Sequence, residues 1–258
     1  MGVYVYIDGF NLYYGALKGT PHRWLNVDTL LNHLIPTRYH PIAKIKYFTA
    51  RVSGATDLDA PRRQRIYLNA LETIPTVEIF YGSFLAKTIW RPLINLPVGN
   101  EIIHSPTQVV LPPGNHVVGA VRPQTLPVSN YPAPGARRPK TPPTPLPNAL
   151  IAQVHAMEEK GSDVNLAAHL INDAWMNLFD AAAVVSNDTD LVTPIMMVTK
   201  QRRKPVFLIC PGRWGASPKL KAVSTWVRHI HPAVLAASQF PNPVVRPYGP
   251  PLAKPATW

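Results

Sequence analysis

The stretch from Glu158 to Asp190 constrains the fold of this chain more than any other part of the sequence. It holds a polar turn, a run with the apolar spacing of an amphipathic helix, and the apolar segment Ala181 to Val185. That segment has the length and composition of a strand buried on both faces of a sheet. Carboxylates follow it at once, as Asp188 and Asp190. Because ligands bind outside the carboxyl ends of strands in open α/β sheets, chemistry is expected at this point.

The helix within this stretch is predicted to lie with its apolar side against a sheet. Apolar residues at i, i+3, i+4 and i+7 define that side. They are Val164, Ala167, Ala168, Ile171, Trp175 and Leu178, and Leu166 and Leu170 widen the stripe.

The rest of the chain alternates strand-like and helix-like segments. Strands are predicted at Val3–Ile7, Ala43–Val52, Val77–Tyr81, Ala181–Val185 and Val206–Ile209, with Thr225–Ile230 as a further short candidate. Helices are predicted at Val27–Leu34, from Asp59 through Leu71, at Leu191–Thr199 and from Ser217 onward. Such alternation indicates an α/β fold with a central parallel sheet of about five strands and helices on both faces.

Proline divides the chain. The sequence has 30 prolines, and they crowd into residues 90–147 and the tail at 239–258. Proline is incompatible with a helix interior or a central strand, so the predicted domain is split into 1–89 and 148–238 around a proline-rich insert. The insert is expected to be extended, with a short hairpin of Ile102-Ile103 and Val117-Val118. A lid or an RNA-contacting arm is one interpretation, and an uninformative flexible insert is the other.

The charge balance indicates a polyanionic partner. The chain has 26 basic and 14 acidic residues, a net charge of +12, for which nucleic acid is the simplest partner and a merely basic soluble protein is the alternative. Arg51, Arg62, Arg63 and Arg65 are the candidates to contact phosphate. Three of them lie near a helix start, where they oppose the helix dipole. Solvated surface arginines are the commoner explanation for such residues.

The compartment is expected to be the cytoplasm. Cys210 is the single cysteine, so no disulfide forms within the chain and a reducing environment suits it. A strand-like run follows Met1 directly, which is unlike a signal peptide. No run of about 18 apolar residues is present to cross a membrane. A homo-oligomer is left open.

Four acidic residues are predicted to meet at one edge of the sheet: Asp8, Asp163, Asp188 and Asp190. Like charges repel, so such a cluster is costly unless a cation lies within it. Oxygen ligands without cysteine suit Mg²⁺ or Mn²⁺. Each residue also has a simpler explanation, because Asp163 and Asp190 can be helix caps and Asp8 and Asp188 can form turns.

Three motifs together resemble the NYN domain family, which belongs to the PIN-like nuclease superfamily. They are Asp8-Gly9-x-Asn11, the block EEKGSDVNLA at 158–167 and SNDTDL at 186–191. The resemblance covers the two ordered segments and leaves out the proline-rich insert and the tail. It implies a PIN-like three-layer fold and a metal-dependent nuclease activity.

The resemblance also implies residue roles. Asp8, Asp163, Asp188 and Asp190 match positions that bind metal in the family. Asn11 would orient substrate or a metal-bound water, Ser186 would support a carboxylate by a hydrogen bond, and Lys160 would contact phosphate. The chain departs from the family pattern at two places where relatives often carry an acidic residue. In the helix after the 158–167 block it has His169, and in the region of the last helix it has Ser224-Thr225. The departures put a full two-metal mechanism in doubt.

Three functions follow as hypotheses. The first is a metal-dependent ribonuclease, an endonuclease, in which Mg²⁺ or Mn²⁺ activates a water that attacks the RNA phosphodiester. The second is an RNA-binding regulatory adaptor with the same fold and little or no turnover. The third is an enzyme that acts on a small phosphorylated or heterocyclic substrate.

Overall fold

The structure is a computed structural model that describes residues 2–36, 38, 41–54, 57–92, 116–126, 146–212 and 215–258. The chain divides into two compact units. The first comprises Met1–Phe84 and Glu159–Trp258, and the second comprises Leu85–Glu158. The hairpin of Ile102-Ile103 with Val117-Val118 cannot be compared, since residues 102–103 lie outside the described residues.

A parallel sheet of six strands forms the centre of the first unit, in the order β3-β2-β1-β7-β8-β9. Its strands are β1 (Val3–Asp8), β2 (Ile42–Thr49), β3 (Val77–Tyr81), β7 (Ala181–Val185), β8 (Val206–Cys210) and β9 (Trp226–His229). The α/β class with a parallel sheet is therefore confirmed. The expected number of about five strands was one too low, because the short β9 pairs with β8 and completes the edge.

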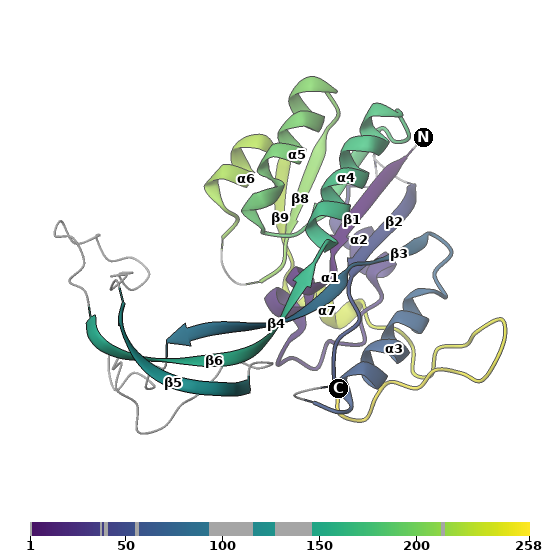
Figure 1. Ribbon diagram of the computed structural model, residues 1–258. Helices are drawn as coiled ribbons and strands as arrows, with labels where there is room; N and C mark the ends of the chain where they lie inside the picture. The colour runs from purple at the N-terminus through teal and green to yellow at the C-terminus, as the bar shows by residue number, and fades with distance from the viewer. Residues whose placement is uncertain are drawn as a thin grey trace. The chain divides into compact units, whose positions relative to one another are not determined.

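Helices cover both faces of this sheet (Figure 1). One face carries α4 (Ser162–Trp175), η3 (Thr189–Leu191), α5 (Val192–Met196), η4 (Met197–Gln201) and α6 (Pro218–Val223). The other carries α1 (Gly9–Leu12), η1 (Tyr13–Leu17), α2 (Val27–Leu34), α3 (Ala60–Leu71) and α7 (Pro232–Ala237). Two clusters of buried apolar side chains, one on each face, hold the three layers together.

Strand alternation assigns residues to the two faces. Val5 and Ile7 pack toward α2 and α3, whereas Tyr6 packs toward α4. Ala181–Val185 is buried at every position, as expected of a central strand covered on both sides.

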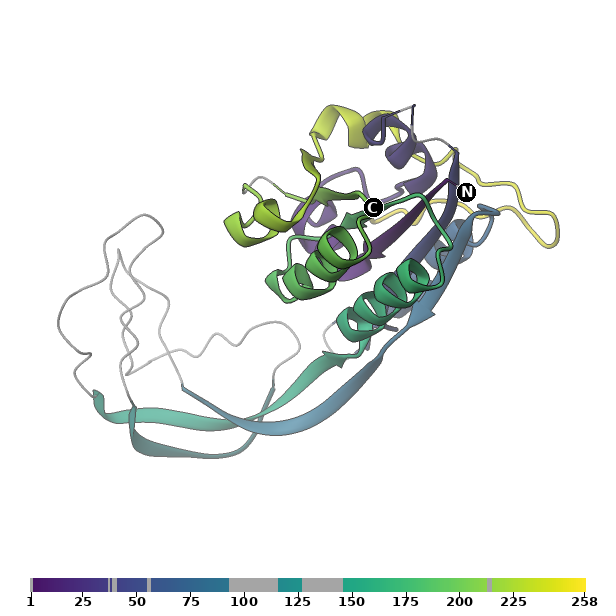
Figure 2. The same cartoon turned by 90° about the horizontal axis from the view of Figure 1, so that it is seen from above.

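The orientation of α4 differs from the prediction. Leu166, Leu170 and Ala174 are fully buried, but Val164 is 71% exposed and Trp175 is 43% exposed. The sequence stripe therefore mixed two sides of the helix, and the side with the leucines faces the sheet. The helix lies along the sheet in Figure 2. Asp173, also on the buried side, is accommodated by an ion pair with Lys46.

Short-range contacts fix several element ends. The Asn26 side chain accepts a hydrogen bond from the Thr29 amide and caps α2. Gly9 begins α1 where a Cβ would lie 2.8 Å from the Phe48 carbonyl oxygen and 2.8 Å from Tyr47 Cε1. Only glycine lets the chain turn so closely over the end of β2.

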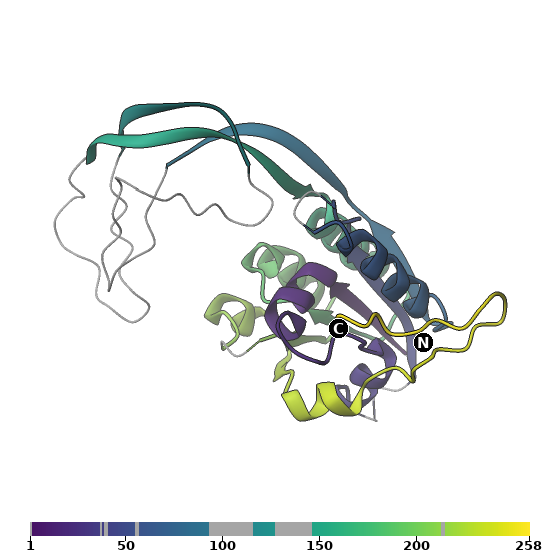
Figure 3. The ribbon, with the colours of Figure 1, turned by 90° about the horizontal axis from the view of Figure 1, so that it is seen from below.

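The tail after α7 is tied to the first unit. Trp24 Nε1 donates to the Pro241 carbonyl at 3.0 Å, and Lys254 Nζ donates to the Pro21 carbonyl at 3.2 Å. Val244 and Leu252 bond to each other across a turn. The tail, drawn in yellow in Figure 3, brings Trp258 against Trp24 and Tyr67, with ring centroids 6.4 and 5.7 Å apart.

The second unit contains a three-stranded sheet in the order β4-β6-β5. Its strands are β4 (Ser83–Pro92), β5 (His116–Leu126) and β6 (Leu146–Lys160), with β5 and β6 antiparallel. Proline-rich sequence therefore does form strands here, beyond the extended loop that was expected.

Candidate functional site

Asp8 stands at the carboxyl end of the central strand β1. Its side chain is 5% exposed and accepts hydrogen bonds from the Asn11 amide at 2.9 Å and from Ser186 Oγ at 3.1 Å. Burial raises the pKa of Asp8 to about 6, and these two hydrogen bonds oppose the rise. The structure thus places Ser186 where the resemblance implied, as the hydrogen-bond partner of a buried carboxylate.

A second layer of hydrogen bonds joins β1 to the segments after β7 and β8. Asn11 Oδ1 accepts from the Asn187 amide at 3.0 Å, and Asn187 Oδ1 accepts from the Ser217 amide at 3.1 Å. Ser186 Oγ also accepts from the Asp188 amide at 3.1 Å. Asn11 is consequently a structural link between α1 and the loop after β7.

The four predicted carboxylates share one edge of the sheet and affect one another. Asp163 has a raised pKa because of its partial burial, and then because of the negative charges of Asp188, Glu159 and Asp190. The charges of Asp163 and Asp188 also raise the pKa of Asp8. Asp8 and Asp188 each cap a short helix with their side chains. The simpler explanation had given caps to Asp163 and Asp190 instead, but Gly161 stands at the N-cap of α4.

These carboxylates do not form a metal centre in the structure. Within the described ranges, no three His, Cys, Asp or Glu side chains come together in a group that could hold a metal ion. The prediction of an Mg²⁺ or Mn²⁺ site on Asp8, Asp163, Asp188 and Asp190 is therefore not supported by the geometry. Asp188 is turned to the Asp190 amide, 2.9 Å away, and Asp8 to Asn11 and Ser186.

The predicted RNA-contacting arginines have partners within the protein. Arg62 and Arg63 pair with Asp59, and Arg63 also pairs with Asp57. These pairs explain why arginines lie in the first turn of α3, where the helix dipole disfavours them. The Arg51 guanidinium lies 4.8 Å from the centre of the Tyr81 ring.

Arg65 and Lys160 are exposed. RNA binding by this group of residues stays a prediction.

An aromatic cavity of about 240 Å³ begins at Gly9, directly after Asp8, on the face of the sheet that carries α1 and α3. It is formed by α1, η1, the end of β2 and α3, and the last residue of the tail. Six aromatic side chains line it: Phe10, Tyr13, Tyr14, Tyr47, Tyr67 and Trp258. Arg23 and Thr49 are among its polar residues. We call this space the aromatic cavity.

The aromatic cavity and Asp8 are electrostatically linked through Tyr47. Burial raises the pKa of the Tyr47 hydroxyl well above its ordinary value, and the negative charge of Asp8 raises it further. The hydroxyl therefore stays protonated at neutral pH and remains a hydrogen-bond donor.

The aromatic cavity was not predicted from the sequence, although the alternation of Tyr47 and Thr49 at the end of a predicted strand was a usable signal. The sequence contained no signal for Trp258, because its contact with Tyr67 depends on the path of the C-terminal tail.

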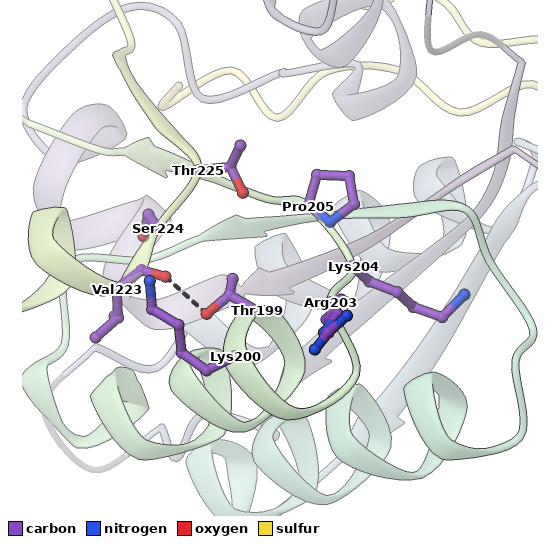
Figure 4. Close-up of a pocket in the computed structure, with 8 residues that line it drawn as sticks. All are labelled: Thr199, Lys200, Arg203, Lys204, Pro205, Val223, Ser224 and Thr225. Atoms are coloured by element: carbon purple, nitrogen blue, oxygen red, sulfur yellow. Dashed lines mark hydrogen bonds between the residues drawn. The ribbon is translucent and has the colours of Figure 1, made fainter.

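A second hollow, of about 380 Å³, lies at the opposite, amino-terminal edge of the sheet (Figure 4). Lys200, Arg203 and Lys204 line it, together with hydroxyl groups of the α6–β9 connection. Basic residues at the end of η4 complement the helix dipole, and Lys204 Nζ donates to the Phe179 carbonyl. The basic residues of this hollow are explained by their place at the end of η4. The hollow lies at the edge of the sheet opposite to the carboxyl ends of the strands.

Comparisons with known proteins indicate a different chemistry from RNA hydrolysis. The chain is 27% identical over 276 residues to 6-hydroxy-3-succinoylpyridine 3-monooxygenase HspA of Pseudomonas putida, covering 98% of this chain and 74% of that protein. A solved structure, of a protein of unknown function from Vibrio parahaemolyticus, covers 90% of this chain and 93% of its own at 13% identity, with a TM-score of 0.42. That TM-score supports no conclusion about fold or function. No protein-family model matches the chain.

The comparison corrects the functional predictions. A relative named as a monooxygenase is an oxidoreductase, so the metal-dependent ribonuclease, the RNA-binding adaptor and the hydrolase class are all wrong on this finding. Mg²⁺ or Mn²⁺ as cofactor is wrong for the same reason and for the lack of a metal-binding group among the described side chains.

In the described part of the chain, no helix combines the length and the apolar character that crossing a membrane requires.

Proposed function

We propose that this chain is an oxidoreductase of the monooxygenase type, acting on a small hydroxylated heteroaromatic compound. The observation that carries the proposal is the match along 98% of the chain to a protein named as the monooxygenase of a hydroxypyridine. The aromatic cavity supports it, since aromatic side chains with a few polar groups suit a planar ring. Of the three sequence hypotheses, the enzyme with a heterocyclic substrate is the one that agrees with this proposal.

Monooxygenation sets the requirements for partners. One atom of O₂ enters the organic product and the other leaves as water, which consumes two electrons and two protons. A reduced organic cofactor, such as a flavin or a nicotinamide, is the usual class of electron donor.

The aromatic cavity does not fit a flavin. Its volume of about 240 Å³ lies below the roughly 300–1,000 Å³ of typical cofactor and drug-sized ligand sites. The segment after β1 is Asp8-Gly9-Phe10-Asn11 and lacks the glycine-rich loop that holds a dinucleotide pyrophosphate. We therefore assign the cavity to the single-ring substrate and not to the electron donor.

The residues around the cavity have distinct roles in this proposal. The aromatic side chains would hold the ring and exclude water. Tyr47, kept protonated by burial and by Asp8, would donate a hydrogen bond to the substrate. Asp8 would act as a positioning residue behind Gly9, because it does not itself line the cavity.

Oxygen uptake tests the proposed function directly. The full chain is incubated with 6-hydroxy-3-succinoylpyridine, NADH and either FMN or FAD, and O₂ consumption is followed with an electrode. We expect substrate-dependent uptake and a product that carries one ¹⁸O atom from ¹⁸O₂. Uptake that does not depend on the substrate, or a product oxygen derived from water, contradicts the proposal.

Three further assignments belong to the proposal. The PIN-like type of the fold and the relation to the NYN domain family are supported by the motifs at Asp8-Gly9-x-Asn11 and 186–191, which follow neighbouring strands. The single cysteine supports the cytoplasm as the compartment. RNA as a partner and a homo-oligomeric state stay predictions.

A further inference from the structure

Two side chains of the aromatic cavity, Tyr47 and Thr49, carry hydroxyl groups with no hydrogen-bond partner among the described residues. Tyr47 and Thr49 alternate along β2, so both side chains lie on the cavity face of the sheet, and they are 4% and 3% exposed. No hydrogen bond joins either hydroxyl to another described residue. Neither hydroxyl is among the enclosed polar atoms without a partner, so both are open to the cavity and each can donate a hydrogen bond to a group that enters between α1 and α3.

Two other polar side chains of the cavity, Tyr67 and Gln64, are already paired. Tyr67 donates to the Leu25 carbonyl at 3.0 Å, and Gln64 bonds to the Val52 amide at 2.9 Å and to the Ala50 carbonyl at 2.8 Å. Their roles are structural. Tyr47 and Thr49 are consequently distinguished from these two by their free hydroxyls.

The cavity also has one cation without an acidic partner in the described parts of the chain. Arg63 is neutralised by Asp57 and Asp59. Arg23, in contrast, uses Nε for a bond to the Thr20 carbonyl at 3.1 Å and forms no ion pair with a described residue. A guanidinium group binds a carboxylate through two parallel hydrogen bonds, which makes Arg23 suited to an anionic substituent.

Two aromatic residues from distant parts of the chain form the wall beside these groups. Tyr67 comes from α3, and Trp258 is brought to it by the tail, 5.7 Å away between ring centroids. A ring held by such a wall gains contact area and favourable edge or face contacts.

We propose that the aromatic cavity binds a single aromatic ring bearing a hydroxyl and a carboxylate. Tyr47 and Thr49 bind the ring hydroxyl, Arg23 binds the carboxylate, and Tyr67 with Trp258 contacts the ring. This inference rests on the proposed function for its choice of a hydroxylated ring, and it names the groups that select that ring.

Calorimetric titration with three probes tests the assignment. The probes are 6-hydroxynicotinate, which carries both groups, nicotinate, which lacks the hydroxyl, and 2-hydroxypyridine, which lacks the carboxylate. The Tyr47→Phe/Thr49→Val variant keeps the shape of the cavity and removes both hydroxyls. We expect it to weaken 6-hydroxynicotinate binding about tenfold, the loss of roughly two ordinary hydrogen bonds, and to leave nicotinate unaffected.

Arg23→Gln should produce the complementary pattern. It is expected to weaken 6-hydroxynicotinate and nicotinate by about tenfold and to leave 2-hydroxypyridine unchanged. Tyr248→Phe and Arg65→Gln are the matched controls, because both residues are exposed and lie outside the cavity. Neither control should alter any of the three affinities.

The outcomes separate this inference from the proposed function. No binding of any probe to the wild type, or equal affinities in wild type and variants, overturns the inference. If the probes bind as expected but no oxygen is consumed, the ligand assignment holds and the monooxygenase proposal fails. If oxygenation occurs while the double variant binds 6-hydroxynicotinate normally, the proposed function holds and the assignment of Tyr47 and Thr49 fails.

Discussion

Asp8 is a buried carboxylate whose ionisation opposes folding. Its pKa is about 6 in the folded protein and near 3.9 in an unfolded chain. The folded state therefore binds more protons than the unfolded state between these values, and stability falls as the pH rises through them. The loss is complete above the folded pKa, so it is present in full at neutral pH.

The first prediction concerns Asp8→Asn. Removing the charge should raise the free energy of unfolding at pH 7 by about 3 kcal/mol and flatten its dependence between pH 4 and pH 6. Urea denaturation at a series of pH values measures both effects. An unchanged pH dependence in the variant would show that another group is responsible.

A second buried charge, on Lys46, is compensated by a partner. Lys46 Nζ lies 2.6 Å from Asp173 Oδ2, with 8% and 3% of the two side chains exposed. Tyr6 donates to the same carboxylate at 2.7 Å, and His169 Nδ1 lies 3.2 Å from Lys46 Nζ. Burial, and then the charge of Lys46, lowers the pKa of His169.

The second prediction compares two lysines of the same strand. Lys46→Met leaves Asp173 buried without its cation and should lower the free energy of unfolding by about 3–5 kcal/mol. Lys44→Met, which breaks the exposed pair with Glu78, should cost about 0.5 kcal/mol. Guanidinium denaturation of both variants provides the comparison, and similar losses would contradict the assigned burial.

At the scale of elements, the sequence predicted type and order well and orientation less well. The bounds of α2, β3 and β7 agree with the predicted segments, because their apolar periods and caps are local properties. The face of α4 could not be obtained in this way. Its sequence has apolar residues on two sides, and only the packing of Leu166 and Leu170 onto the sheet decides between them.

The third prediction tests that orientation. Leu170→Ala should lower the free energy of unfolding by about 2–4 kcal/mol through lost burial and a cavity, whereas Val164→Ala should change it by less than about 0.5 kcal/mol. Both are read from denaturation midpoints. Equal losses of stability in the two variants would mean that the side of α4 with Val164 also packs against the sheet, as the sequence predicted.

At the scale of the whole molecule, the second unit enters and leaves the first at neighbouring points. A Cβ on Gly82 would lie 2.7 Å from the Lys160 carbonyl oxygen and 2.9 Å from Ser162 Oγ. Both clusters of buried apolar side chains found in the described chain belong to the first unit. The residues of the aromatic cavity also come from the first unit alone.

The fourth prediction follows from this closeness. Replacing Leu85–Glu158 by a short Gly-Ser linker should leave the first unit folded and its binding of 6-hydroxynicotinate unchanged. Circular dichroism with a cooperative thermal transition checks the fold, and calorimetric titration checks binding. Loss of a cooperative transition would mean that the second unit is required for folding.

The site was less predictable than the fold for a physical reason. Asp8, Asp163, Asp188 and Asp190 were brought to one edge as expected, because parallel strands and the start of a helix fix where they lie. Whether they bind metal depends on side-chain directions that strand order does not set. The aromatic cavity depends on Trp258 meeting Tyr67 across most of the chain, which no local pattern encodes.

The position of β1 in the sheet has a consequence for the order of synthesis. β1 is made before β2 and β7 but lies between them in the sheet, and Val3 pairs with Ala181. Between Tyr81 and Ala181 lie about 100 residues, which a ribosome produces in roughly 5–20 s. During that time the finished β1-β2-β3 part has an open strand edge beside β1, with unpaired amides and carbonyls. In a nascent chain of this protein that edge therefore stays unpaired by its native neighbour until β7 emerges.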